Sequence, residues 1–255
     1  MFRQLTRLAN SLAAAILFIG VPVIAHAQQT SPPVYAVLSL VGDQLGIVQP
    51  APRPELNFAP YQRSPLYLEN QLFDQSVVNA AGIAIRKIVP NAELAALNTR
   101  SPVLYEKQAS LFEESAGAIA IPQAIKNAAQ QQNASYLVLV TKHRDDLSLR
   151  FDNHRRDNGK LEGIGFYMDD ASPESSRARG FVAPYAYLRV ALIDAKTWNV
   201  LSRQTIIAST NVPAGNARNA SRQWGTMTPE EKARAVDNLL RAEVGKVIPL
   251  LLKTG

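Results

Sequence analysis

Histidine and aspartate residues gather in the middle of the chain, where their chemistry suits acid–base work or metal binding. The candidates are two histidines and the aspartates beside them: His143, Asp145, Asp152 and His154. An imidazole within reach of a carboxylate can serve as a general base, and both side chains are ligands of zinc. One hypothesis is therefore a hydrolase in which His143 acts with Asp145 or Asp152.

The spacing of these residues matches no established catalytic or ligand motif. There is no pair of histidines one helical turn apart with a glutamate between them, no Gly-x-Ser-x-Gly elbow and no phosphate-binding loop. The chain has no cysteine, which excludes a thiol nucleophile. These observations favour a solvated, charge-balanced loop over a site, and they predict no metal and no cofactor.

The same region is rich in basic residues, but acidic residues interrupt them. Six positive side chains share the segment with four aspartates: Lys142, Arg144, Arg150, Arg155, Arg156 and Lys160 against Asp145, Asp146, Asp152 and Asp157. A mixed surface of this kind does not attract anions strongly. Salt bridges within the segment are the favoured interpretation.

Aromatic residues in the second half of the chain are the best candidates for a binding surface. Tyr187 and Arg189 share one face of a predicted strand, and Trp198 and Trp224 lie further along. If Tyr187 and Arg189 point outward, they form a surface for a ligand or partner. The alternative is that the rings belong to the core, as aromatic side chains more often do, because helices are expected on both faces of the sheet.

The first residues have the pattern of an export signal. Arg3 and Arg7 form a positive segment, Leu12 to Ile24 is apolar, and Ala25-His26-Ala27 fits a cleavage site, so residues 1–27 are predicted to be removed. A retained membrane anchor is the alternative, although the apolar run is shorter than the roughly 20 residues that a bilayer requires. No later stretch is apolar enough to span a membrane.

An exported chain without cysteine is typical of the bacterial periplasm, and the missing cysteine excludes lipoprotein anchoring. The formal charge of +6 falls to +4 when Arg3 and Arg7 leave with the signal, which holds no acidic residue. This mild charge permits an anionic partner without requiring one, and export makes nucleic acid a poor candidate. The predicted location is therefore the periplasm.

Residues 28–255 are expected to form a single α/β (α+β) domain, a mixed β-sheet with several helices packed on it. Its centre is the strand Ser135 to Val140, which is apolar on both faces. Other strands are predicted at 34–41, 45–48, 92–97, 147–151, 161–168, 185–193 and 200–210. The first two are expected to form a hairpin, and 147–151 is expected to pair back on the central strand after a turn at Asp145-Asp146.

Helices are predicted at about 74–89, from 101, at 122–133 and from 229 into the C-terminal region. Asp74 is expected to cap the first helix, and Gly82 to mark close packing on the sheet. Thr228 and Glu231 have the spacing of a capping box before an amphipathic C-terminal helix, which Pro249 is expected to kink or end.

Three segments are predicted to lack helix or central strand: a proline-rich excursion at 49–65, a mobile loop at 169–180 and a loop at 211–225. The turn after residue 193 ends in Asn199, which is able to adopt a left-handed conformation.

The succession of Ser135–Val140, the alternating strand Tyr185–Ile193, the turn Asp194–Thr197 and Val200-Leu201 resembles that of certain periplasmic modules. These are the N-terminal domain of the Tol–Pal propeller protein and the lipoprotein activators of penicillin-binding proteins. Their hairpin turn reads Asp-x-x-Thr-Gly, and here Trp198 stands at the glycine position. The activators also carry a lipidated cysteine, which this chain lacks.

The resemblance extends over about Asp74–Thr210, and it implies a non-catalytic binding module of the cell envelope. The chain also looks like exported Gram-negative proteins that have no assigned role. The sequence therefore favours a soluble periplasmic binding or assembly module that contacts another envelope protein. The alternative is a periplasmic hydrolase that uses His143 with the nearby aspartates.

Overall fold

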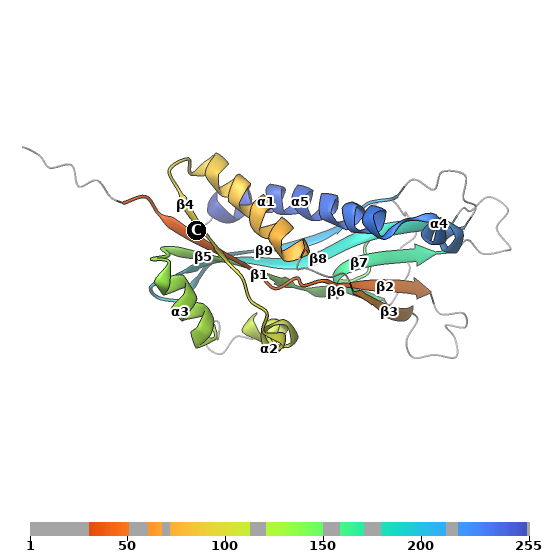
Figure 1. The fold of residues 1–255 in the computed structure, drawn as a ribbon, viewed down its shortest axis with the longest axis horizontal. Coiled ribbons are helices and arrows are strands. Elements are labelled where there is room, and N and C mark those ends of the chain that lie inside the picture. Colours follow the sequence, from red (N-terminus) through yellow and green to blue (C-terminus); the bar gives the residue numbers. More distant parts are fainter. Residues whose placement is uncertain are drawn as a thin grey trace, which may run out of the picture. The chain divides into compact units, whose positions relative to one another are not determined.

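A mixed β-sheet with helices on both faces makes up the residues from Pro32 onward, which form one compact unit (Figure 1). In this computed structural model the described residues are 31–50, 61–67, 72–112, 121–149, 159–170, 180–212 and 219–253. The α+β class that the order of helical and strand patterns predicts is confirmed.

Nine strands form the sheet in the described part of the chain: β1 (Val34–Ser39), β2 (Gln44–Pro50), β3 (Tyr61–Tyr67), β4 (Glu93–Leu97), β5 (Tyr136–Lys142), β6 (Arg144–Asp146), β7 (Lys160–Asp169), β8 (Phe181–Asp194) and β9 (Val200–Ser209). The same residues contain five α-helices and one short 3-10 helix: α1 (Leu72–Ile88), α2 (Pro102–Glu106), η2 (Gln108–Phe112), α3 (Gln123–Gln131), α4 (Ala220–Thr226) and α5 (Pro229–Lys253).

The long strand β8 organises the sheet. It pairs antiparallel with β9 through residues 185–193. β7 pairs with residues 181–187 of β8, and β5 pairs with residues 188–194. Because β9 occupies one edge of β8 over both of these stretches, β7 and β5 must lie end to end along the other edge.

The next row of the sheet is also made of two strands laid end to end. β1 is parallel to β5, and β2 is parallel to β7. β4 then pairs with β1, and β3 pairs with β2. We call the place where the two halves meet the junction; it consists of residues 40–43, 142–143 and 162–163, and backbone hydrogen bonds such as Gly163 N to His143 O cross it.

The expected hairpin of 34–41 with 45–48 is wrong. β1 and β2 share no backbone ladder, and each pairs with a different half of the sheet. Gly42 has φ of 69°, and the segment around it moves the chain from one half to the other. Alternating apolar residues show that a segment is a strand, but they do not show which strand lies beside it.

The expected return of 147–151 onto the central strand is also wrong. Both edges of β5 are occupied, by β1 and β8, and Asp145 and Asp146 belong to the short strand β6. β6 pairs with the start of β7, and the Leu147 N–H donates to the Gly159 carbonyl. The central position predicted for β5 is confirmed by its place between β8 and β1.

Helices cover the two faces of the sheet with separate apolar clusters. One face packs against α1 and α5 through alternate residues of the strands, among them Val138, Val140, Leu188 and Val190. The opposite face packs against η2 and α3 around Leu137 of β5 and Ala36 and Leu38 of β1. Further along this second face, a third cluster contains Val48, Tyr167, Tyr185 and Tyr187.

Several local expectations about the helices are confirmed. A Cβ on Gly82 would lie 3.0 Å from Leu94 Cδ1, so α1 does pack closely on β4. The capping box before α5 is present, since Thr228 Oγ1 accepts from Glu231 N and Glu231 Oε2 accepts from Thr228 N at 3.2 and 2.8 Å. The helix continues through Pro249 to Lys253, so Pro249 does not end it.

Other local expectations need correction. Asp74 lies in the first turn of α1, and its carboxylate binds residues of β1 and the junction instead of capping the helix. Trp198, and not Asn199, has positive φ in the β8–β9 turn. α4 begins in the segment 211–225 that is expected to be loop, with Asn219 as its cap.

Some predictions concern residues that the structure does not describe or describes only in part. The export signal, most of the proline-rich segment and residues 171–179 lie outside the described residues. Both described ends of the proline-rich segment are strand: Gln49 and Pro50 end β2, and residues 61–65 belong to the edge strand β3, where Pro65 is found as expected for proline in a sheet. Among the described residues, none of the helices has the length and hydropathy needed to cross a bilayer.

Candidate functional site

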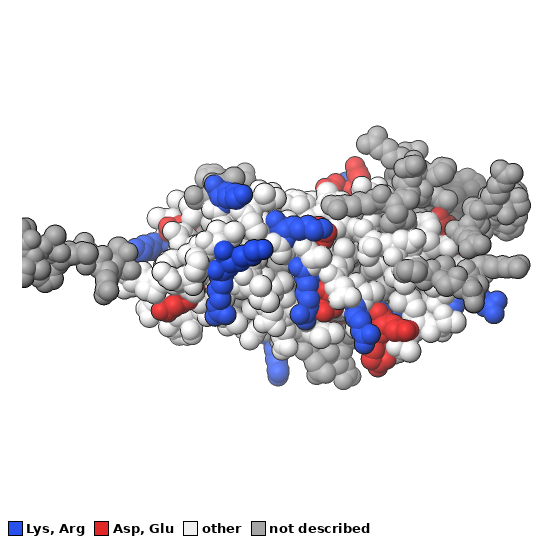
Figure 2. Space-filling model, turned by 90° about the horizontal axis from the view of Figure 1, so that it is seen from above, with Lys and Arg blue, Asp and Glu red and all other residues white. Residues whose placement is uncertain are grey.

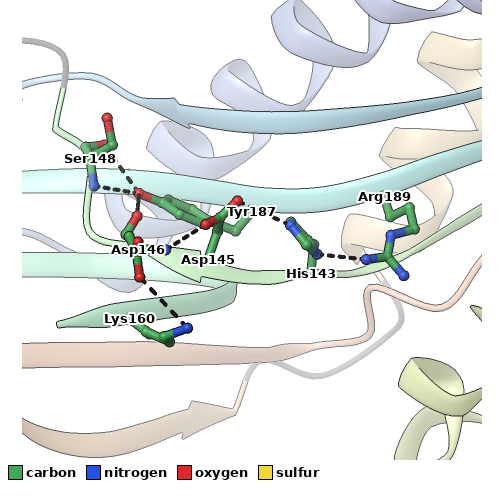
Figure 3. A network of polar contacts seen from close by, with 7 residues as sticks. All are labelled: His143, Asp145, Asp146, Ser148, Lys160, Tyr187 and Arg189. Carbon is green, nitrogen blue, oxygen red and sulfur yellow. Dashed lines mark hydrogen bonds and ion pairs between the residues drawn. The ribbon is translucent and has the colours of Figure 1, made fainter. Parts of the chain in front are cut away.

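The predicted acid–base pair comes together between β5 and β6. His143 follows the last residue of β5, and Asp145 is the middle residue of β6. Asp145 Oδ2 lies 3.3 Å from His143 Nε2, and the two side chains are 40% and 17% exposed (Figure 3). The backbone fixes the histidine on both sides, because its N–H donates to Tyr187 O and its carbonyl accepts from Gly163 N.

The second ring nitrogen of His143 faces Arg189, which extends from β8. Arg189 Nη2 lies 3.2 Å from His143 Nδ1 (Figure 3). A guanidinium can only donate, so Nδ1 must accept, and the ring proton of the neutral imidazole sits on Nε2. That N–H then donates to Asp145. In this arrangement neither ring nitrogen offers a lone pair to a substrate, so His143 is not placed to act as a general base.

Tyr187 lies beneath this network as a buried residue of β8. Its hydroxyl oxygen accepts from Ser148 N at 2.8 Å, and its hydrogen faces the carbonyl oxygens of Ser148 and Asp146 at 3.1 and 3.3 Å. Burial raises the pKa of the Tyr187 hydroxyl to about 12. The ring therefore holds the segment after β6 against β8, and it does not face outward as a binding surface requires.

The carboxylates of β6 complete the network toward solvent. The pKa of Asp145 is lowered, first by the hydrogen bond from Asp146 N and then by the interaction with His143 and the nearby charge of Lys160. Asp146 forms an exposed ion pair with Lys160, at 3.6 Å between Oδ1 and Nζ. The predicted salt bridging within this charged segment is thus found for Lys160 with Asp146, and it does not extend to Lys142 among the described residues. Asp152 and His154 lie outside the described residues, so no geometry joins them to His143.

The two tryptophans predicted for binding are half-buried, and they pack against different core clusters. Trp198 packs against the cluster around Leu137, with Lys126 Nζ 5.4 Å from the ring centroid. Trp224 packs edge-on against Phe166, with Lys232 Nζ 4.0 Å from its centroid. Neither ring belongs to the network of His143, so the four binding candidates do not form one surface.

A buried carboxylate at the junction is the feature that the sequence interpretation missed. Asp74 is 5% exposed and accepts from Val41 N at 2.9 Å, from Gly42 N at 3.2 Å and from the hydroxyl groups of Ser39 and Tyr105 at 2.5 and 2.8 Å. Burial and the Asp74 carboxylate raise the pKa of Tyr105. Asp74 therefore supports the segment that carries the chain between the two halves of the sheet.

Lys142 is a second feature that the sequence does not single out, because it is one of several charges in a mixed segment. Its N–H donates to Gln108 Oε1 at 2.7 Å, and its side chain lies against Gly163. Burial lowers the pKa of the Lys142 ammonium, and the charges of Glu162, Asp74 and Asp43 oppose that shift. The only sequence signal is its position, as the basic residue that ends an otherwise apolar strand.

Metal binding finds no support in the described ranges, where no three histidine or acidic side chains cluster closely enough to hold an ion. This observation concerns the described residues alone.

Comparison with known proteins gives matches only among solved structures. No protein-family model matches the chain, and no curated protein matches it. A DUF330 protein from Xanthomonas campestris is 9% identical over 89% of this chain and 90% of its own, with a TM-score of 0.41. PelC from Paraburkholderia phytofirmans, solved as a dodecamer, is 11% identical over 87% of each chain, with a TM-score of 0.31.

The C-terminal domain of LpoB from Salmonella enterica is 10% identical over 71% of this chain and 86% of that chain, with a TM-score of 0.23. These similar structures come from Gram-negative bacteria. Every one of these TM-scores is below 0.5.

Proposed function

We propose that the chain is an exported, non-catalytic binding module of the bacterial cell envelope, and that it acts by contacting another envelope protein. The observation that carries this proposal is the engagement of both ring nitrogens of His143, by Arg189 on Nδ1 and by Asp145 on Nε2. His143 is the strongest catalytic candidate in the chain, and these two contacts make it part of the framework that joins β5, β6 and β8.

Export is part of the same proposal and rests on the N-terminal sequence. Arg3, Arg7, the apolar segment and Ala25-His26-Ala27 form a cleavable signal. Mass spectrometry of the protein purified from a periplasmic extract should therefore find Gln28 at the N-terminus. A protein that keeps residues 1–27 and fractionates with the membrane would contradict cleavage and favour the anchor.

The surface that α1 and α5 present supports a protein partner over a polyanion. Figure 2 shows basic side chains standing singly on a largely uncharged surface, with acidic ones among them. Two of the basic groups of α5 are already in ion pairs, Arg241 with Asp237 and Lys246 with Glu243. Ile83 of α1 is 69% exposed. A surface with mixed charge and exposed apolar groups resembles the rim and core of protein interfaces.

Crosslinking in intact cells followed by mass spectrometry tests the proposal. The expected result is a reproducible adduct with one other envelope protein, absent from cells that lack this chain. Recovery of the chain only as an uncrosslinked monomer, at normal abundance, would count against a protein partner.

The hydrolase alternative retains one favourable observation, the 3.3 Å approach of Asp145 to His143. It requires any hydrolytic activity of the purified protein to disappear in His143→Ala while the fold persists. Activity that survives this substitution would remove the alternative, and its loss in a folded variant would overturn the non-catalytic proposal.

A further inference from the structure

A polar pocket of about 260 Å³ opens beside the junction. Its walls come from β2, β3 and β8, together with the end of β5 and the start of β7. Gln44, Gly46 and Val48 alternate along β2 and so share one face. Val48 packs with Tyr185 in the third cluster, apart from the cluster of α1 and α5, so the pocket opens on the face away from these two helices.

Two opposite charges line this pocket, those of Lys142 and Glu162. Among the described residues, no side chain forms an ion pair or hydrogen bond with the Lys142 ammonium or with the Glu162 carboxylate. Lys142 is half-buried and Glu162 is exposed. A half-buried charge with no counter-ion in contact is costly, because burial removes water, and the charges of Glu162, Asp74 and Asp43 offset this cost only in part. Burial accordingly lowers the pKa of the Lys142 ammonium.

Glycines shape the pocket so that these groups can reach it. Gly163 has φ of 67°, and a Cβ there would lie 2.8 Å from Lys142 Cδ, so the lysine chain lies directly on the glycine. A Cβ on Gly46 would lie 2.5 Å from Tyr185 Oη. The missing side chain leaves room for that hydroxyl, which donates to Gly46 O at 3.2 Å and lines the pocket with an oxygen that can accept a further bond.

A second basic group stands on the opposite wall. Arg63 of β3 donates through Nη2 to the carbonyl of Lys160, which fixes its direction, and it has other N–H donors. The pocket therefore combines an ammonium and a guanidinium with one carboxylate and neutral polar groups.

We propose that this pocket binds a small zwitterion, an amino acid or a dipeptide. Lys142 and Arg63 bind its carboxylate, and Glu162 binds its ammonium. A volume of about 260 Å³ is close to the lower end of the roughly 300–1,000 Å³ found for small-molecule sites, so only a compact ligand fits. The proposal goes beyond the contact with an envelope protein, since it concerns a different kind of ligand and stands without that contact.

Calorimetric titration of the purified full chain tests the proposal with defined probes. Glycine and glycylglycine carry both charges, acetate and inorganic phosphate carry only negative charge, and methylammonium carries only positive charge. The expected result is binding of a zwitterion at least about tenfold tighter than acetate, phosphate or methylammonium, since each lost charge pair is worth about one decade or more. Failure of both zwitterions to bind, or equal binding of acetate or phosphate, would overturn the proposal.

Substitutions then assign the site. Lys142→Met and Glu162→Gln should each weaken zwitterion binding at least about tenfold. Glu162 is exposed, and glutamine has nearly the same shape as glutamate, so Glu162→Gln should fold. This variant therefore tests the site even if Lys142→Met does not fold. The matched controls are Lys87→Met and Glu106→Gln, at exposed positions on α1 and α2. Binding that Glu162→Gln leaves unchanged, or that the controls weaken equally, would contradict the assignment.

Discussion

Arg189 Nη2 donates to His143 Nδ1 at 3.2 Å, and this contact determines how the charged segment after β5 is held. Arg189 comes from β8, and His143 leads from β5 into β6. The pair therefore links the long strand that runs through the sheet to the point where its neighbouring row changes from β5 to β7. Loss of this contact should therefore affect the stability of the fold more than any catalytic activity.

The first prediction concerns His143. His143→Ala removes the acceptor that Arg189 uses and the donor that faces Asp145, and it should lower the free energy of unfolding by about 1–3 kcal/mol. Asp145→Ala, at the more exposed end of the pair, should cost less than about 1 kcal/mol. Urea unfolding measures both, and equal stability of His143→Ala and the wild type would contradict the structural role.

The second prediction concerns Asp74 and Tyr105, whose carboxylate and hydroxyl oxygens are 2.8 Å apart. Asp74→Ala should cost about 3 kcal/mol or more, because several buried donors lose their acceptor together, at roughly 1–3 kcal/mol each. Tyr105→Phe alone should cost about 1.5–3 kcal/mol, as for other hydrogen bonds to a charged group. In a double-mutant cycle, Tyr105→Phe should cost clearly less when Asp74 is already alanine. Additive losses would show that the two side chains are not coupled.

The third prediction concerns alkaline pH. Burial raises the pKa of Tyr187 to about 12, compared with about 10 for tyrosine in an unfolded chain. A pKa that is raised on folding contributes stability that is complete below pH of about 10 and is lost as the pH rises through about 12. The unfolding free energy measured between about pH 9 and pH 12 should therefore fall less steeply in Tyr187→Phe. The control is Tyr67→Phe, at a residue 69% exposed, which should follow the wild-type curve.

The fourth prediction concerns the turn between β8 and β9. Trp198 has φ of 62°, a left-handed conformation that a residue with a Cβ adopts at a cost of about 1–2 kcal/mol. Trp198→Gly and Trp198→Ala both lose the ring and its contact with Lys126, but only alanine retains the strain. The glycine variant should therefore be more stable than the alanine variant by about 1 kcal/mol in thermal or urea unfolding. The reverse order would mean that the turn relaxes when the ring is removed.

Local patterns in the sequence predicted much of the fold. The alternation in 185–193 identifies β8, and Thr228 with Glu231 marks the start of α5, because these signals depend only on neighbouring residues. Pairing was not predictable in this way. A two-residue repeat of side chains along the sequence shows that β1 and β2 are strands. It does not show that the sheet is divided into two halves.

The candidate site was predicted only in part, for a related physical reason. His143 and Asp145 are close in the chain, so their contact follows from local spacing. Arg189 is brought to His143 by the pairing of β5 with β8, which no local pattern reveals. Lys142 and Glu162 likewise face one pocket only because the junction brings β5 and β7 together.

Site-specific photo-crosslinking in living cells tests the central claim most directly. A photoreactive residue replaces, one at a time, Tyr67 of β3, Ile83 of α1 and Leu201 of β9, whose side chains are 69%, 69% and 37% exposed. If the chain is an envelope binding module, irradiation should join at least one of these positions to the same envelope protein, and adjacent surface positions should extend that footprint. Absence of any adduct from all three positions, in cells that export the variants at wild-type levels, would contradict the account.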